Sequence, residues 1–165
     1  HGFGVKVISP VEVDCKVVSS SLIRKALEAG DIKLARSMLG YDPMLEGHVI
    51  EGERRGRTIG FPTANLAVSS ELNVPGKGVY AARAQIQERI FQAVVNIGSK
   101  PTFHEEYPVS IEAHLIDFHE DIYGEKMRLY FIDKIRDERR FNNVEELVGQ
   151  ISRDRDKAKQ IAAGQ

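Results

Sequence analysis

The amino-acid sequence predicts a mainly β fold, in which short antiparallel strands close into a small barrel that is followed by a C-terminal helix. Two observations lead to this prediction. From residue 41 onward, apolar and polar residues alternate in five or six short runs separated by Gly-, Pro- and Asn-containing turns, which is typical of small barrels. Near residue 143 this alternation gives way to apolar residues at helical spacing. The chain has 165 residues, enough for one such domain and a fragment of another.

The first 40 residues have a different pattern, in which short strand-like runs at 5–8 and 11–13 are followed by helical spacing. Three consecutive serines at 19–21 precede an apolar helical run over 22–29, and any of them could cap that helix. Gly30 can end it, and Asp31 can start a second helix that runs to residue 39. The sequence therefore predicts two short helices before the first strand of the barrel.

The predicted strands begin with residues 44–51, which lead into a glycine-rich segment. A hairpin follows a turn cluster at 73–78, and two more alternating runs come later. The apolar residues of these runs are Tyr80, Ala82, Ala84 and Ile86; Phe91, Ala93, Val95 and Ile97; Val109, Ile111, Ala113 and Leu115; and Met127, Leu129 and Phe131. A period of two places the apolar side chains of each run on one face of its strand.

The C-terminal helix is expected to begin after Asn143, which can cap it, with Glu146 as the partner in a capping box. Apolar residues then follow near one helical stripe: Val144, Leu147, Val148, Ile151, Ala158 and Ile161. We expect this stripe to pack against the barrel wall. Arg153, Asp154 and Lys157 are interpreted as a solvated charged face of the same helix.

Composition narrows the possible functions. With 23 basic and 24 acidic side chains, the formal net charge is −1, and the chain lacks the basic surface expected of a nucleic-acid-binding protein. Its single cysteine, Cys15, cannot form an internal disulfide, which favours a reducing compartment. No apolar run is long enough to span a bilayer. We therefore expect a cytoplasmic protein without nucleic-acid or membrane partners.

The segment with the clearest chemistry is residues 52–66. Three glycines recur in it at four-residue spacing: Gly52, Gly56 and Gly60. Glycines let backbone amides approach an anion, and the arginines between them fit phosphoryl oxygens. Thr63 and Asn65 add two short oxygen-bearing side chains, which we expect to lie outside the core in an extended loop and to point the same way. A solvated glycine-rich turn has the same composition, and neither the Walker A nor the dinucleotide-binding pattern is present.

Two segments in and just before this region, GHVIEG at 47–52 and GRTIGFPTANL at 56–66, closely resemble the signature of bacterial riboflavin kinases. The resemblance covers residues 41–163 nearly continuously. It implies that residues 41–165 form a six-stranded Greek-key barrel with a C-terminal helix. It also implies an ATP-dependent kinase that transfers the γ-phosphoryl group to the terminal ribityl hydroxyl of riboflavin, giving FMN and ADP.

The resemblance also implies roles for single residues. Thr63 and Asn65 match the threonine and asparagine of the family's P-T-A-N motif, which meet Mg²⁺ and the nucleotide phosphates. Glu112 matches the catalytic glutamate, although a glutamate at this position also suits a solvated strand face. Arg136 and Glu138 match the family's R-x-E-x-x-F loop on the flavin side. The remaining residues expected at the nucleotide are Gly52, Gly56, Arg57, Gly60, Pro62 and Asn96.

His114 shares a strand face with Glu112. No second histidine lies at metal-binding spacing, so we interpret His114 as a structural neighbour of Glu112 rather than a metal ligand.

Residues 18–24, VSSSLIR, resemble the I-S-S-T-x-I-R motif that closes the adenylyltransferase module of bifunctional flavin-nucleotide synthesising enzymes, with Ser21 in place of the family's threonine. The resemblance implies that residues 1–40 are a helical remnant of an α/β nucleotidyltransferase domain, and that the natural chain carries this module upstream. The family's H-x-G-H phosphate-binding motif is absent. We therefore expect no FMN adenylyltransferase activity from this chain.

Two alternatives to a riboflavin kinase remain at this point. One is a flavin- or nucleotide-binding barrel without turnover, which Thr63, Asn65 and Glu112 disfavour because a binder has no need of a base. The other is a nucleic-acid-binding barrel that uses the arginines at 54, 55 and 57, which the net charge and the lack of nearby aromatic residues disfavour.

Overall fold

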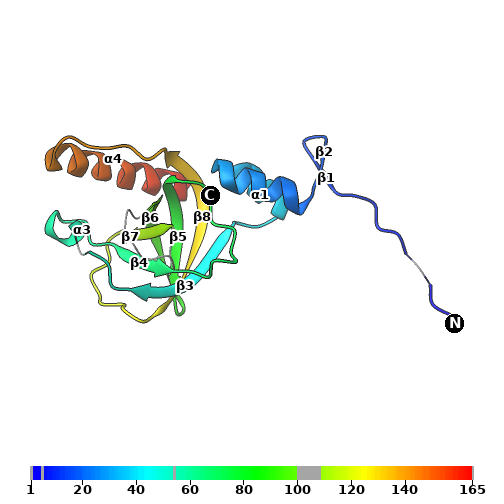
Figure 1. Ribbon diagram of the computed structural model, residues 1–165, viewed down its shortest axis with the longest axis horizontal. Coiled ribbons are helices and arrows are strands. Elements are labelled where there is room, and N and C mark those ends of the chain that lie inside the picture. The colour runs from blue at the N-terminus through cyan, green and yellow to red at the C-terminus, as the bar shows by residue number, and fades with distance from the viewer. Residues whose placement is uncertain (1, 5, 54, 100–108, 165) are drawn as a thin grey trace.

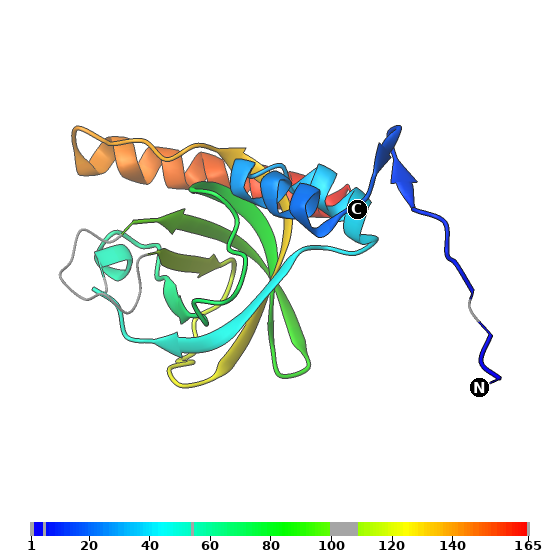
Figure 2. The same cartoon turned by 45° about the vertical axis from the view of Figure 1, so that its right-hand side comes forward.

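A computed structural model of the chain describes residues 2–4, 6–53, 55–99 and 109–164. An extended N-terminal stretch and a two-stranded hairpin, β1 (Glu12–Val13) and β2 (Lys16–Val17), lead away from the body of the molecule (Figure 1). In Figures 1 and 2, one long helix lies across one side of a β-barrel, and two shorter helices lie near the C-terminal end of that helix. No helix in the described part of the chain combines the length and the apolar character that a membrane span requires.

Six strands form the barrel: β3 (Met44–Ile50), β4 (Ala64–Ala67), β5 (Gly78–Ile86), β6 (Arg89–Gly98), β7 (Ser110–Leu115) and β8 (Lys126–Arg136). The helices are α1 (Ser20–Ala29), α2 (Ile32–Leu39), α3 (Arg55–Thr58) and α4 (Val144–Ala163). All strand pairs are antiparallel, and the barrel closes in the order β3-β4-β7-β6-β5-β8. Because β8 returns to lie beside β5, strands β5 to β8 form a Greek key. The predicted six-stranded barrel is confirmed.

The apolar residues whose alternation predicted the strands fill the barrel interior. Val95, Leu129 and Phe131 have no exposed surface. The ring of Tyr80 packs edge to face on Phe131, with 5.6 Å between the ring centroids. Full burial of one such side chain stabilises the fold by about 1.5–3 kcal/mol, so this cluster dominates the apolar contribution of the barrel.

Helix α4 covers the outer face of β5, β6 and β8. The Asn143 side chain caps it by accepting a hydrogen bond of 2.8 Å from the Glu146 backbone. Ala158 and Ile161 pack against apolar residues on the outside of the barrel. The predicted helix and its packing are confirmed, except that Val144 at its first turn is 54% exposed.

Asp154 does not belong to a solvated charged face, and that prediction is wrong. It is 2% exposed, and its carboxylate accepts hydrogen bonds from Arg136 and Gln150. Spacing explains its position, because residue 154 lies seven residues after Leu147 and four before Ala158, on the stripe that faces the barrel. A charged residue at a core position of a helix requires a partner, and β8 provides the arginine.

Helices α1 and α2 form as predicted. Ser19 is the serine that caps α1, and its side chain accepts a hydrogen bond from the Leu22 backbone. Gly30 ends α1 with φ +74°, a left-handed conformation that glycine adopts without strain. Asp31 caps α2 by accepting from the Leu34 backbone at 3.0 Å.

These two helices pack closely on the barrel. Their buried residues belong to the same apolar cluster as the barrel interior: Ala26, Leu27, Ile32 and Ala35. The Gly76 backbone donates to the Leu27 carbonyl at 2.8 Å, and a Cβ on Gly76 would overlap the carbonyl oxygen of Glu28. Lys33 forms an ion pair of 2.8 Å with Asp133 on β8. Residues 20–39 are thus joined to the barrel by backbone contacts as well as by side chains.

Strand β4 and helix α3 have no counterpart among the predicted elements. Strand β4 has only four residues, and three of them are buried in a row, so no alternation marks it. Helix α3 is a single turn inside the glycine-rich segment.

Candidate functional site

Two cavities open beside the segment that contains residues 56–65. The first, of about 400 Å³, lies between that segment, strands β3, β4 and β7, and the connection after β7. We call it the loop cavity. The second, of about 280 Å³, lies between the outer face of the barrel and the first half of α4, and we call it the helix cavity. Among the residues that the structure describes, Thr63 is the one that lines both cavities, so the two spaces meet at this side chain.

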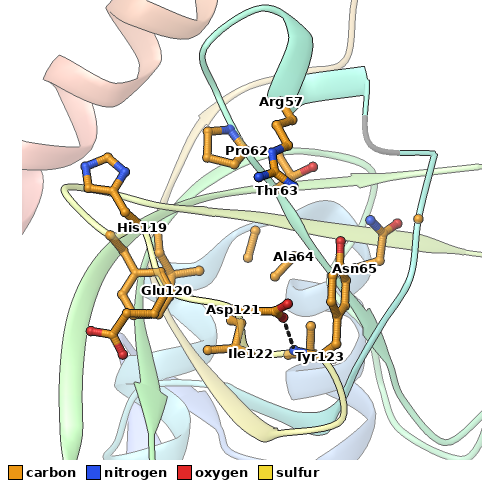
Figure 3. Close-up of a pocket in the computed structure, with 15 residues that line it drawn as sticks. Arg57, Pro62, Thr63, Ala64, Asn65, His119, Glu120, Asp121, Ile122 and Tyr123 are labelled. Atoms are coloured by element: carbon orange, nitrogen blue, oxygen red, sulfur yellow. Dashed lines mark hydrogen bonds between the residues drawn. The ribbon is translucent and has the colours of Figure 1, made fainter.

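The loop cavity is lined on one side by Arg57, Pro62, Thr63 and Asn65. The opposite wall comes from residues 118–123, which lie more than fifty residues later in the chain. Figure 3 shows Arg57, Pro62 and Thr63 grouped together, with the side chains of the 118–123 connection lying across the cavity from them. The cavity thus has the Arg57 guanidinium and the neutral side chains of Thr63 and Asn65 on one side, and a mixed wall on the other that includes aromatic rings, a histidine and the carboxylates of Glu120 and Asp121.

Asn65 lies in β4 and is only 7% exposed, so the expectation that it belongs to a loop outside the core is wrong for this residue. It pairs with Ile50 on one side and Glu112 on the other. A Cβ on Gly52 would overlap the Asn65 side chain. Gly52 therefore makes room for Asn65, which differs from the predicted role of presenting a backbone amide to an anion.

The other two glycines shape the segment around α3. The Phe61 backbone donates to the Gly56 carbonyl at 2.8 Å, and a Cβ on Gly56 would overlap the Phe61 carbonyl oxygen. Gly60 has φ +83° and lines neither cavity. Among the three predicted glycines, Gly52 lines the loop cavity and Gly56 the helix cavity.

The helix cavity has apolar walls and a polar floor. Its apolar residues are Ile59, Phe61, Val79, Val94, Phe141, Leu147 and Ile151. Asn96 and Glu112 line it from β6 and β7, and Arg136 and Glu138 from the end of β8 and the residues that follow. A flat apolar ligand with a polar tail would find both kinds of surface here.

Three polar side chains form a row across adjacent strands. Asn65 on β4 is paired with Glu112 on β7, and Glu112 is paired with Asn96 on β6. Directly paired residues of antiparallel strands point to the same face of a sheet. Their neighbours in sequence, such as Ala113, belong to the interior cluster, so the row points outward. Three residues far apart in the sequence are thus brought together by strand register.

The Glu112 carboxylate is held by a neighbour on its own strand. The buried hydroxyl of Ser110 donates to Glu112 Oε1 at 3.1 Å. Glu138 lies over the end of β6, where a Cβ on Gly98 would overlap its carboxylate. Gly98 thus leaves space for a second acidic group at the rim of the helix cavity.

His114 also lines the helix cavity, two residues after Glu112. Its Nδ1 lies 2.8 Å from the Pro62 carbonyl oxygen, and its ring meets the Phe61 ring edge to face, with 5.4 Å between centroids. Burial lowers the pKa of His114 below its ordinary value, and the hydrogen bond to Pro62 opposes this shift only in part. The ring is therefore neutral at pH 7.

Arg136 faces the helix cavity, but protein groups already occupy much of its guanidinium. It donates to the Asp154 carboxylate and to the Asp137 carbonyl. It lies near the Phe141 ring, at 5.7 Å from the ring centroid. Arg136 thus joins β8, the following loop and α4 at the cavity wall.

Several cavity residues were not predicted from the sequence. In the loop cavity they include Phe118, Ile122 and Tyr123, which lie between two predicted strands. In the helix cavity they include Phe61, Leu147 and Ile151, of which the last two were predicted as helix-packing residues. Asn96 begins the segment NIGSKPTF at 96–103, which resembles the N-I-G-x-x-P-T-F segment of riboflavin kinases. Residues 100–103 of this segment lie outside the described residues, as does Arg54.

The oxygen atoms of Thr63 and Asn65 are the donor type that Mg²⁺ prefers. No group of three His, Cys, Asp or Glu side chains suited to a metal ion occurs among the described residues. A divalent ion that uses these two neutral ligands fits the cavity only if phosphate oxygens and water complete its coordination.

Comparison with known proteins agrees with this geometry. Residues 39–162 match the family model Flavokinase, described as riboflavin kinase. The chain is 43% identical over 157 residues to a bifunctional riboflavin kinase/FMN adenylyltransferase of Bacillus subtilis, which covers 94% of this chain and 50% of that protein. The protein of the same name from Escherichia coli K12 is 40% identical over 138 residues, or 83% of this chain and 44% of that protein.

Two solved structures are also similar. One, titled macrolide-efflux protein from Streptococcus pneumoniae, has a TM-score of 0.86 and 37% identity, and the match covers 92% of this chain and 50% of that chain. The other, riboflavin kinase from Trypanosoma brucei, has a TM-score of 0.54 and 20% identity over 72% of this chain and 78% of that chain, a likeness in fold.

The chain spans about half the length of the curated relatives it matches, and the matched family model spans most of the chain. The barrel, its covering helix and the two cavities that meet at Thr63 all lie largely within the matched residues. This chain belongs to the riboflavin kinase family.

Proposed function

We propose that this chain transfers the γ-phosphoryl group of ATP to the terminal ribityl hydroxyl of riboflavin and releases FMN and ADP. The observation that carries the proposal is the meeting of two unlike cavities at one side chain, Thr63. A phosphoryl transfer between two bound substrates needs two adjacent sites whose reacting ends face each other.

The loop cavity is proposed as the nucleotide site. Arg57 would neutralise phosphate charge there, and Thr63 and Asn65 would bind phosphate oxygens and the divalent ion. We propose Mg²⁺ as that ion, held by Thr63 and Asn65 together with phosphate oxygens and water; when bound, it would neutralise charge on the nucleotide phosphates. Pro62, Gly52, Gly56 and Gly60 would act by shaping the segment that presents these side chains.

The helix cavity is proposed as the flavin site. Its apolar walls suit the isoalloxazine ring, and the polar side chains of Asn96 and Glu112 suit the ribityl chain. Asn96, which the sequence analysis expects at the nucleotide, lines this cavity and not the loop cavity, and we propose it near the ribityl end instead. Arg136 and Glu138 would form the rim on the ring side.

Glu112 is proposed as the general base. Its carboxylate would accept the proton of the ribityl hydroxyl while the hydroxyl oxygen bonds to the γ-phosphorus and the bond to the ADP oxygen breaks. Ser110 would keep the carboxylate directed along the floor of the cavity, because its hydroxyl is buried and bound to Oε1.

The organisation of the chain gives a second part to the proposal. Residues 1–40 would be the end of an adenylyltransferase module that lies upstream in the natural protein, and residues 41–165 the kinase. The length of the curated relatives supports this division. We also propose that the protein acts in the cytoplasm, as the single cysteine suggests.

The test is to incubate the chain with riboflavin, ATP and Mg²⁺ and to separate the flavins by chromatography. We expect FMN without FAD, and no FMN when ATP is omitted. Bound riboflavin without any FMN would instead favour a non-catalytic flavin-binding barrel. Formation of FAD from FMN and ATP would contradict the proposed division of the chain.

A further inference from the structure

His114 joins the segment before β4 to strand β7 at the junction of the two cavities. Its Nδ1 lies 2.8 Å from the carbonyl oxygen of Pro62, the residue that directly precedes Thr63. The carbonyl can only accept a hydrogen bond, so Nδ1 must carry the proton. His114 is therefore a donor to the backbone of the segment that presents Thr63.

This bond continues the β4–β7 ladder by one step. The ladder pairs Asn65 with Glu112 and Ala64 with Ala113, so its register would next place Thr63 opposite His114. Strand β4 begins only at Ala64, and the described backbone pairing with β7 stops there. The His114 side chain supplies a hydrogen bond at this place, where the backbone ladder has ended.

The bond also connects two functional positions. Glu112 and His114 lie two residues apart on β7, so their side chains share the outward face, and both line the helix cavity. Thr63 lines both cavities. A displacement of the Pro62 carbonyl would therefore change the position of Thr63 relative to Glu112.

We propose that His114 is a positioning residue for phosphoryl transfer, whose Nδ1–H holds the Pro62 carbonyl and so fixes Thr63 against Glu112. The effect of His114 on phosphoryl transfer rests on the proposed function, whereas its contact with the Pro62 carbonyl does not. The edge contact with Phe61 offers a competing, purely apolar role for the same ring.

Three substitutions separate these roles. His114→Asn places an amide nitrogen near the position of Nδ1, His114→Gln places one near Nε2, and His114→Phe keeps an aromatic ring without a donor. His48→Gln is the matched control, because His48 Nδ1 also lies near a backbone carbonyl, that of Gly124 at 3.3 Å, but His48 lines neither cavity.

The kinetic readout is kcat for FMN formation with saturating riboflavin and Mg·ATP. Loss of the hydrogen bond to the Pro62 carbonyl predicts about a tenfold lower kcat for His114→Gln and His114→Phe. His114→Asn should recover kcat to within about threefold of the parent, and the control should change it by less than about twofold. The KM for riboflavin should change less than kcat in each variant.

A second readout needs no turnover. Amide hydrogen exchange of residues 59–64, followed by mass spectrometry, should be faster in His114→Gln and His114→Phe than in the parent and in His114→Asn. If the parent forms no FMN but the exchange pattern holds, the proposed function fails and the positioning contact stands.

Two results would overturn the inference. One is a kcat of His114→Asn as low as that of His114→Gln, which would mean that the hydrogen bond donated by Nδ1 does not determine kcat. The other is a His114→Phe variant with parental kcat and exchange, which would mean that ring packing alone is needed. If His114→Phe does not fold, the comparison of the Asn and Gln variants decides between the two outcomes.

Discussion

Arg136 on β8 and Asp154 on α4 form a buried ion pair that closes one wall of the helix cavity. Arg136 Nε lies 3.1 and 3.0 Å from the two carboxylate oxygens of Asp154, and Nη2 lies 2.8 Å from Oδ2. Gln150 Nε2 adds a bond of 2.7 Å to Oδ1. Helix α4 is thus fixed to the barrel by a buried charged pair in addition to its apolar contacts.

Removal of one member of this pair should destabilise the fold strongly. Asp154→Ala would leave the Arg136 guanidinium, whose side chain is 20% exposed, without its main partner. A broken buried pair of this kind costs about 3–5 kcal/mol, to be measured by urea unfolding. Asp156→Ala is the matched control, because Asp156 on the same helix pairs with Arg155 at the surface, and such pairs contribute about 0–1 kcal/mol. Equal, small effects of both substitutions would contradict the assigned role of Asp154.

Thr63→Ala and Asn65→Ala should both lower activity, but only Asn65→Ala should also lower the stability of the fold. Thr63 precedes β4, so its substitution should leave the free energy of unfolding almost unchanged. Loss of one contact to a charged phosphate or metal group should raise the activation free energy by about 1.5–3 kcal/mol, measured as kcat/KM for Mg·ATP. Asn65→Ala should lower both activity and stability, because it also empties a packed position beside Gly52. Parental turnover in both variants would exclude the proposed nucleotide contacts.

Glu112→Gln should reduce kcat far more than substrate affinity. The amide keeps the shape of the side chain and can still hydrogen-bond, but it cannot accept the proton. General-base catalysis contributes about 10²–10⁴ in rate, and we expect the lower end because loose phosphoryl-transfer transition states need less help from a base. Ser110→Ala should give a smaller loss, since it only frees the carboxylate. A kcat of Glu112→Gln within about threefold of the parent would reject Glu112 as the base.

The stability of the fold should depend on pH through His114. Burial lowers the pKa of its ring in the folded state, so the unfolded chain binds a proton more readily than the folded one. The free energy of unfolding should therefore fall as the pH decreases below about 6.5, the ordinary pKa of histidine, and continue to fall through the folded-state pKa. Urea unfolding of the parent and of His114→Asn at pH 7.5 and pH 5.5 measures the contribution of His114 to this loss of stability. We expect a smaller loss on acidification in the variant, and an equal loss in both would assign the effect to other groups.

The contact between the N-terminal helices and the barrel should tolerate no side chain at Gly76. A Cβ there would overlap the backbone oxygen of Glu28, and crowding of this kind costs about 1–3 kcal/mol. We therefore expect Gly76→Ala to lower the thermal midpoint. Gly149→Ala is the control, because no atom lies within 4 Å of a Cβ built at this helical glycine, and alanine favours a helix by about 1 kcal/mol. A Gly76→Ala variant as stable as the parent would mean that α1 can move away from the barrel at little cost.

The sequence predicted most of the barrel because alternation shows clearly in its long strands. Residues such as Ala82 and Ala84 on β5 have their interior positions fixed by a period of two. Strand β4 was not predicted, because both of its faces are used: Ala64 and Leu66 face the interior, while Asn65 faces the site. A four-residue strand that is buried on both faces has no periodic signal.

The sequence predicted which residues belong to the candidate site but not how they are arranged in space. Motif resemblance pointed to Thr63, Asn65 and Glu112, and the structure brings their strands together. The far wall of the loop cavity, with Phe118 and Tyr123, was not predicted, because only the closure of the barrel places residues 118–123 opposite residues 57–65. The burial of Asp154 was not predicted, because a charged side chain favours an exposed position, whereas its place on the helical stripe puts it against the barrel.

The positions of Asn65, Glu112 and Asn96 depend on the register in which β4, β7 and β6 pair. Side chains of a strand alternate between two faces, so a one-residue slip of β7 against β4 and β6 would turn Glu112 toward the apolar interior and Ala113 toward the helix cavity. The same slip would place a charge in the core and remove the proposed base from the helix cavity. A shift in strand alignment would therefore abolish folding and activity together, and no partly active, misaligned barrel should accumulate.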